Sequence, residues 1–273
     1  LRAKERETAD FDAPQIGTFL HFLLEHVTKD VMAQGGFQDV ADAELHRLTE
    51  HYIQSYLQQQ IRNFQERSAR FRYLFDRLKG LAFAIVEETA EELRHSDFVP
   101  LEFELEFGSH GALPAVQIHE VDSELRITGK VDRVDGWLQD GKLFLRVVDY
   151  KTGRKSFDLS EVRMGLDIQM LLYLFTLQKE GAGYFGHPIE PAGVLYFPAR
   201  DEILSAERNI SPEKLLELRQ KTLRRSGLLL NDRTVLEAME HESLTEPHYL
   251  PLRINRAGDI TAGVASAEQL GKL

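Results

Sequence analysis

The sequence predicts an α/β protein with an N-terminal helical layer, and a change in hydrophobic spacing carries this prediction. Between residues 16 and 27 the apolar side chains recur every three or four positions, which is the spacing of an amphipathic helix. From residue 98 the period becomes two: Leu101, Phe103 and Leu105 alternate with glutamates, as in a half-exposed strand. We therefore expect helices first and a sheet after them.

The remaining elements follow from the same two spacings. The predicted helices have apolar residues three and four apart and cover residues 16–27, 42–64, 68–93, 159–179, 212–225 and 234–240. The predicted strands are short and rich in β-branched residues, and they cover residues 98–107, 115–119, 125–134, 142–150 and 193–197. Turn signals such as Gln139-Asp140-Gly141 separate consecutive strands, which suggests an antiparallel meander.

The chain contains no internal repeat, low-complexity segment or long linker, so a single domain over residues 1–273 is the simpler prediction. Within it we expect a helical layer (1–97), a core (98–200) and a C-terminal helical and extended part (201–273). The chain opens without methionine and stops in what resembles the first turns of a helix. These ends suggest a piece excised from a longer protein.

Composition excludes several kinds of chemistry. There is no cysteine among the 273 residues, so these residues cannot form disulfides, thiolate metal sites or a cysteine nucleophile. No apolar run approaches the roughly 20 residues that span a bilayer, and no signal segment opens the chain, so we expect a cytoplasmic protein. The formal charge of −11 opposes nucleic-acid binding by bulk electrostatics alone.

The most informative residues are Asp132, Asp149 and Lys151. Asp132 lies on one predicted strand, and Asp149 and Lys151 end the next one, two positions apart and hence on one face. Two carboxylates offer the hard oxygen ligands that suit Mg²⁺, and an ammonium group can stabilise charge on an attacked phosphate. An ordinary strand-end ion pair or a polar turn remains the structural alternative for each of them.

Several motifs of this chain resemble the PD-(D/E)xK nuclease superfamily in its RecB-like branch. They occur in the family's order: Gly17-Thr-Phe-Leu-His-Phe-Leu-Leu-Glu25, Gly129-Lys-Val-Asp-Arg-Val-Asp135, Val148-Asp-Tyr-Lys-Thr-Gly153 and Gln169-Met-Leu-Leu-Tyr173. The resemblance implies a restriction-endonuclease-like core, with a central mixed sheet flanked by helices. It also implies Mg²⁺ or Mn²⁺ as the cofactor and DNA as the substrate.

The resemblance also assigns residues. Asp132 and Asp149 become metal-binding carboxylates, Lys151 the catalytic lysine, and His21 a metal ligand or its close support. It places Gln169 and Tyr173 beside the DNA backbone, although Tyr173 could equally pack in the core. Asp135 is either a carboxylate that supports the site from behind or a turn residue after the strand, and we expect the turn.

Arg225-Ser-Gly-Leu-Leu-Leu-Asn-Asp232 and the closing segment resemble AddB-type nuclease domains. This resemblance implies an AddA-type helicase–nuclease subunit as partner. It further implies an iron–sulfur cluster in a full-length protein, which this cysteine-free sequence cannot hold by itself. No phosphate-binding Gly-x-x-x-x-Gly-Lys loop is present, so ATP hydrolysis is not expected of these residues.

The leading hypothesis is therefore a metal-dependent (exo)deoxyribonuclease that acts within a helicase–nuclease in double-strand break repair by recombination. Two alternatives remain open at this point. One is a catalytically idle DNA-binding or scaffold module of the same fold. The other is a metal-dependent hydrolase of a different phosphate ester, for which the histidine spacing gives no support.

Overall fold

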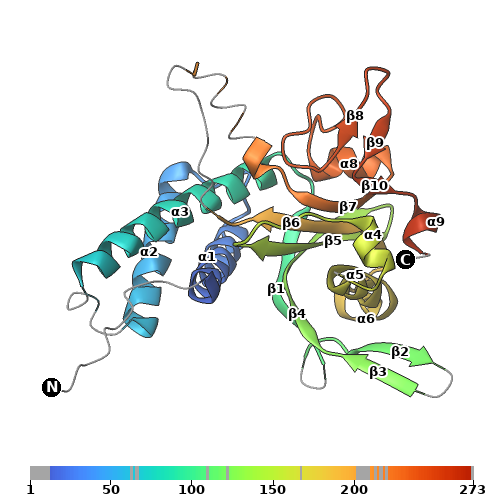
Figure 1. Cartoon of the computed structure of the whole chain (residues 1–273), viewed down its shortest axis with the longest axis horizontal. Coiled ribbons are helices and arrows are strands. Elements are labelled where there is room, and N and C mark those ends of the chain that lie inside the picture. Colours follow the sequence, from blue (N-terminus) through green and yellow to red (C-terminus); the bar gives the residue numbers. More distant parts are fainter. Residues whose placement is uncertain are drawn as a thin grey trace. The chain divides into compact units, whose positions relative to one another are not determined.

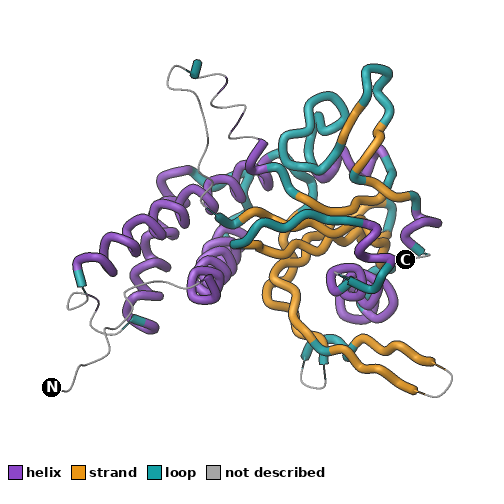
Figure 2. Tube along the Cα trace, viewed as in Figure 1, coloured by secondary structure: helices purple, strands orange, loops and turns teal. Residues whose placement is uncertain are grey.

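The computed structural model of the chain describes residues 13–61, 64, 68–108, 111–120, 123–166, 168–200, 210, 211, 214, 218 and 221–271. The chain divides into two compact units, Leu1–Ala90 and Glu91–Leu273. The first is helical and the second is built on a sheet (Figure 2). The single domain expected over 1–273 stays a prediction.

The helical unit contains the three helices expected from the sequence: α1 (Ala13–Ala33), α2 (Asp42–Gln60) and α3 (Ala69–Arg94), whose last four residues belong to the second unit. Its core is aromatic. Phe19 of α1 lies 4.9 Å from Tyr56 of α2 and 5.7 Å from Phe75 of α3, measured between ring centroids. The apolar stripe predicted for residues 16–27 is therefore the face that α1 buries.

The second unit is organised around a six-stranded sheet with the order β1-β4-β5-β6-β7-β10 (Figure 1). The β5–β6 and β7–β10 pairs are parallel and the other pairs are antiparallel, so the sheet is mixed. The six strands are β1 (Val99–Phe107), β4 (Gly129–Gln139), β5 (Lys142–Lys151), β6 (Ile189–Pro198), β7 (Ser226–Leu230) and β10 (Val264–Ala265). Two hairpins stand apart from it: β2 (Val116–Glu120) with β3 (Ser123–Ile127), and β8 (Arg253–Ile254) with β9 (Ile260–Ala262).

Helices flank this sheet. They are α4 (Leu159–Arg163), α5 (Gln169–Glu180), α6 (Ala182–Phe185), α8 (Arg233–Met239) and α9 (Ala267–Leu270). The α5 helix packs on β5 and β6, with Leu171, Leu174 and Leu177 buried against the sheet. Between β4 and β5 the turn residues Asp140 and Gly141 both have positive φ, as a two-residue hairpin requires.

The structure corrects four local predictions. The predicted strand 125–134 is two strands, because the chain passes at Thr128 from the β2–β3 hairpin into the main sheet. For the same reason, residues 115–119 do not join the predicted meander, although β1, β4 and β5 do run antiparallel in succession. The predicted helix 159–179 is broken into α4 and α5 near Gly165, whose φ of +78° a helix cannot accommodate. Asp135, expected in a turn, lies fully buried within β4.

The region before β7 was also predicted incompletely. Half of the predicted helix 212–225 lies outside the described residues, although residues 221–223 are helical and Arg225 is not. The β7 strand was not predicted, since Gly-Leu-Leu-Leu lacks the alternation or β-branching typical of a strand. Among the described residues, no helix is both long enough and apolar enough to span a membrane.

Candidate active site

Asp132 lies where β4 separates from β5. The β4–β5 ladder ends at the Arg133–Val148 pair, whereas β4 stays paired with β1 as far as Gly129 (Figure 1). At this point Asp132 Oδ2 accepts a hydrogen bond of 2.8 Å from the backbone N–H of Tyr150. That bond joins Asp132 to the end of β5, where Asp149 and Lys151 lie on either side of Tyr150. The three residues predicted from sequence thus come from strands that are directly bonded here.

Asp149 and Lys151 form a close ion pair at the end of β5. Lys151 Nζ lies 2.6 Å from Asp149 Oδ2, and the two side chains are 39% and 21% exposed. This contact does not have the geometry of a hydrogen bond. Within the described part of the chain, the buried Asp149 Oδ2 therefore accepts no hydrogen bond. Lys151 Nζ also lies 5.6 Å from the ring centroid of Tyr196 on β6, which favours the cation. Both side chains are therefore held at the edge of the sheet while remaining accessible to solvent.

A third carboxylate, missed by the sequence analysis, stands beside Asp132. Glu104 of β1 lies between the Phe103–Arg133 and Leu105–Val131 pairs, opposite Asp132. Ligand oxygens of Glu104 and Asp132 lie within 4.8 Å of each other. In the sequence, Glu104 is only one glutamate of an alternating strand, so its spacing gave no signal of a site. Only the register between β1 and β4 distinguishes it from Glu102 and Glu106.

A buried network of charged side chains lies behind these strands. It contains three arginines and two carboxylates, all less than 4% exposed: Arg133, Arg146, Arg225, Glu92 and Asp135. Asp135 Oδ2 accepts from both Arg133 Nη2 and Arg146 Nε, at 3.0 and 2.9 Å. Arg133 Nη1 also donates to the Tyr150 hydroxyl at 3.0 Å. Because Arg133 follows Asp132 and Tyr150 follows Asp149, the network fixes the backbone from which both carboxylates project.

Glu92 connects the end of α3 to this network. Its carboxylate accepts from Arg225 Nη2 at 2.6 Å and from Arg146 Nη2 at 3.1 Å. Burial alone would raise the pKa of Glu92, but the guanidinium groups of Arg225, Arg146 and Arg133 lower it to about 2. Burial also raises the pKa of the Tyr150 hydroxyl, which therefore stays neutral and accepts from Arg133. The pairing keeps Glu92 charged across the physiological range.

Gln169 and Tyr173, the predicted DNA contacts, lie on one face of α5 and bond to each other. Gln169 Nε2 donates to the Tyr173 hydroxyl at 2.7 Å, and the Tyr173 ring stacks on Phe107 at 5.0 Å. Gln169 is exposed, whereas Tyr173 is only 2% exposed and belongs to the core. Its hydroxyl approaches Gly129 so closely that a Cβ there would lie 1.6 Å from the oxygen. Gly129 thus has a packing function at the start of β4.

Replacing Gly129 by alanine should lower the free energy of unfolding by about 1–3 kcal/mol, the usual cost of overpacking. The cost should shrink in a Tyr173→Phe background, where the nearest clashing atom is absent. Urea unfolding of the variants measures both effects. Gly183→Ala is the matched control, because a Cβ at that helical position meets nothing within 4 Å. A Gly129→Ala variant as stable as the control would contradict this packing argument.

His21, the fourth predicted residue, lies on α1 in the helical unit and is half-buried. It belongs to the other compact unit, so its membership of a metal site stays a prediction.

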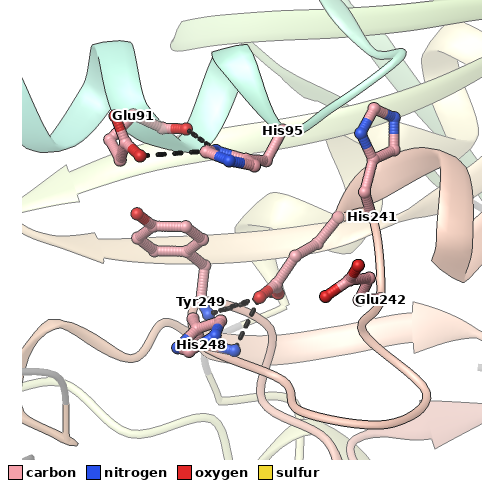
Figure 3. Close-up of a pocket in the computed structure, with 7 residues that line it drawn as sticks. Glu91, His95, His241, Glu242, His248 and Tyr249 are labelled. Carbon is pink, nitrogen blue, oxygen red and sulfur yellow. Dashed lines mark hydrogen bonds and ion pairs between the residues drawn. The ribbon is translucent and has the colours of Figure 1, made fainter.

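A pocket of the sheet unit lies away from these residues. It has a volume of about 500 Å³ and is lined by Glu91, His95, Glu240, His241, Glu242, His248 and Tyr249 (Figure 3). The buried carboxylate of Glu240 already accepts backbone N–H groups from residues 248–250, and His95 bonds to the Glu91 carbonyl oxygen. None of the predicted site residues lines this pocket. The acidic groups at the edge of the sheet are therefore the better candidate site.

The residues present fit a divalent cation. Glu104, Asp132 and Asp149 supply carboxylate oxygens of the kind that hard cations prefer, and one buried Asp149 oxygen receives no hydrogen bond from the described residues. These three carboxylates and the ammonium groups of Lys130 and Lys151 carry three negative and two positive charges, a net charge of −1. A divalent cation would change this sum to +1, the sign that suits a phosphodiester.

The chain belongs to the PD-(D/E)XK nuclease superfamily, whose family model matches residues 1–255. It is similar to ATP-dependent helicase/deoxyribonuclease subunits of the B type. The relative from Acetivibrio thermocellus is 32% identical over 270 residues, which is 98% of this chain and 24% of that protein. Those from Caldanaerobacter subterraneus and Clostridium tetani are 31% and 28% identical, over 95% and 94% of this chain and 22% and 23% of their own lengths. The chain spans about a quarter of the curated relatives that it matches.

Proposed function

We propose that this chain hydrolyses phosphodiester bonds of DNA with Mg²⁺ or Mn²⁺, as an exonuclease. The observation that carries the proposal is the convergence of Asp132 with Asp149 and Lys151 through the 2.8 Å bond from Tyr150 N–H to Asp132. In a member of this nuclease superfamily, two carboxylates and an ammonium group on directly bonded strands are the chemical groups suited to a cation and a phosphate.

In this proposal each residue has a separate task. Asp132 and Asp149 hold the cation, with His21 as a further ligand or its support. A bound divalent cation supplies an activated water molecule for attack on phosphorus. Lys151 directs its ammonium group to the phosphate, where it stabilises the charge that develops during the attack. The buried Arg133 and Tyr150 keep the two strands aligned while this happens.

Gln169 is proposed to contact the DNA backbone. It is exposed at the start of α5, and its amide is oriented by the bond to Tyr173. Tyr173 then acts by positioning Gln169, because it is itself buried.

The relatives suggest a wider context. Their names describe a subunit of an ATP-dependent helicase and deoxyribonuclease, and this chain matches about a quarter of their length. We propose that the chain is the nuclease part of such a subunit, working with an AddA-type partner in recombinational repair of double-strand breaks. The alternative is an idle scaffold of the same complex. A full set of Asp132, Asp149 and Lys151 favours activity, because a scaffold has no chemical need for all three.

The test is cleavage of end-labelled linear duplex and single-stranded DNA with Mg²⁺, Mn²⁺ or EDTA. We expect cleavage with either metal and none with EDTA. Asp132→Asn should lower the rate about 10²-fold, since it removes charge but keeps an oxygen to accept the Tyr150 N–H. Asp140→Asn, in the turn at the far end of β5, is the control and should cleave normally. A folded wild-type chain that binds the metals but cuts no DNA would support the scaffold.

A further inference from the structure

We infer that Glu104 is a third carboxylate ligand of the catalytic cation, and that its ion pair with Lys130 does not replace this role. This inference rests on the proposed nuclease function and adds a metal ligand from β1, a strand from which the sequence motifs predicted none. It follows from three features of the β1–β4 pair.

The first feature is position. Glu104 lies opposite Asp132, and their ligand oxygens are within 4.8 Å of each other, a separation that one cation with ligands at about 2.0–2.6 Å can bridge. Asp132 in turn accepts from the backbone that joins Asp149 to Lys151. Glu104, Asp132 and Asp149 thus come from three neighbouring strands, β1, β4 and β5. A cation held by all three would bind the strands together where β4 and β5 separate.

The second feature is the backbone of Glu104 itself. Its φ is +52°, in the left-handed region that a glutamate adopts only at an energetic cost. Glu102 and Glu106, on the same strand, do not have positive φ. Glu104, the glutamate of β1 that faces Asp132, is therefore the one that has the left-handed conformation. The β1–β4 pairing on both sides of it holds that conformation in place.

The third feature is the ion pair between Glu104 and Lys130. Lys130 Nζ contacts Glu104 Oε2, and the Lys130 side chain is 47% exposed. The Glu104 side chain remains 20% exposed, so solvent and ions can reach it. Two carboxylates this close repel each other, and a divalent cation relieves that repulsion more effectively than a lysine shared at one oxygen. Lys130 thus pairs with Glu104 without replacing the cation.

The alternative is that Glu104 serves only to pair with Lys130, and the two variants Glu104→Gln and Lys130→Met separate these roles by their opposite effects. Glu104→Gln removes a ligand and should therefore weaken Mn²⁺ binding by the 273-residue chain about tenfold. Lys130→Met removes the neighbouring ammonium group and should leave the affinity for Mn²⁺ unchanged or make it tighter, because a competing positive charge disappears. Glu106→Gln is the matched control, an exposed glutamate two positions along the same strand, and should bind Mn²⁺ as the wild type does.

Calorimetric titration with Mn²⁺, together with the EPR signal of free Mn²⁺, measures the affinity independently of DNA cleavage. Circular dichroism and the thermal midpoint establish that each variant is folded. If Glu104→Gln unfolds, Glu104→Asp keeps the charge on a shorter side chain and should bind Mn²⁺ with intermediate affinity. The Mg²⁺ concentration for half-maximal cleavage should rise in parallel.

Two outcomes overturn the inference in different ways. If the wild type neither binds Mn²⁺ nor cleaves DNA, the proposed nuclease function fails and the role of Glu104 with it. If the wild type does both, and Glu104→Gln binds Mn²⁺ as tightly as Glu106→Gln, only the role of Glu104 fails. Equal weakening by Glu104→Gln and Lys130→Met would likewise assign Glu104 to the ion pair alone.

Discussion

Replacing Lys151 by methionine should lower the rate of DNA cleavage about 10³-fold while Mn²⁺ binding is retained. Methionine keeps much of the aliphatic stem that lies near Tyr196 but removes the ammonium group beside Asp149. If that group stabilises charge on the attacked phosphate, its loss raises the activation free energy by about 4 kcal/mol. The effect should appear in kcat, because the charge develops mainly in the transition state.

Lys155→Met is the matched control for this prediction. Lys155 Nζ lies 6.0 Å from the same Tyr196 ring, so the substitution removes an equivalent charge from the same surface. Single-turnover cleavage of labelled DNA should be within about threefold of wild type for this control, well below the roughly 10²-fold that one electrostatic contributor supplies. A Lys151→Met enzyme that cleaves as fast as the control would rule out a catalytic role for Lys151, even if metal dependence is observed.

Replacing Glu92 by glutamine should cost about 3–5 kcal/mol of unfolding free energy, the largest stability effect that we expect from one substitution. Glu92 is buried between Arg146 and Arg225, and without its charge three buried arginines would share one carboxylate, Asp135. Urea unfolding at neutral pH measures the loss. Glu91→Gln, at the preceding residue, is the control. The Glu91 side chain is 49% exposed, so its ion pair with Arg94 should contribute less than about 1 kcal/mol to the free energy of unfolding.

The pH dependence of the Glu92 effect has a definite sign. The pKa of Glu92 is lowered in the folded protein, from the ordinary value of 4.5 to about 2, so its charge stabilises the fold fully above pH 4.5. This stabilisation is lost as the pH falls from about 4.5 to about 2, because protons then bind the unfolded chain more readily. The difference between wild type and Glu92→Gln should therefore be constant near neutrality and shrink in acid. A difference that stays the same down to pH 3 would contradict the ion-pair explanation.

The sequence alone determined the periodic elements and the chemical identity of most of the candidate site. Helical and strand spacing predicted α2, α3, β1 and β5 to within a few residues at each end, whereas α1 (Ala13–Ala33) extends beyond the predicted 16–27 on both sides. The segments around Asp132 and Asp149 predicted the carboxylates of the candidate site, since these residue types at the ends of buried strands have few structural uses. Spacing could not predict where a regular pattern stops. The breaks at Thr128 and Gly165 follow from the transfer of the chain between sheets and from a left-handed glycine.

Only the tertiary structure decided which of several similar residues matter. Glu102, Glu104 and Glu106 are equivalent in sequence, and the β1–β4 register alone brings Glu104 opposite Asp132. Arg146 interrupts an apolar strand in a way that sequence leaves unexplained. The structure places it within hydrogen-bonding distance of Asp135, its partner on β4, and of Glu92, which is 54 residues away along the chain. The physical reason is the same in both cases. A charge acts on whatever lies within a few ångströms of it, and that neighbourhood is set by long-range strand pairing rather than by local sequence.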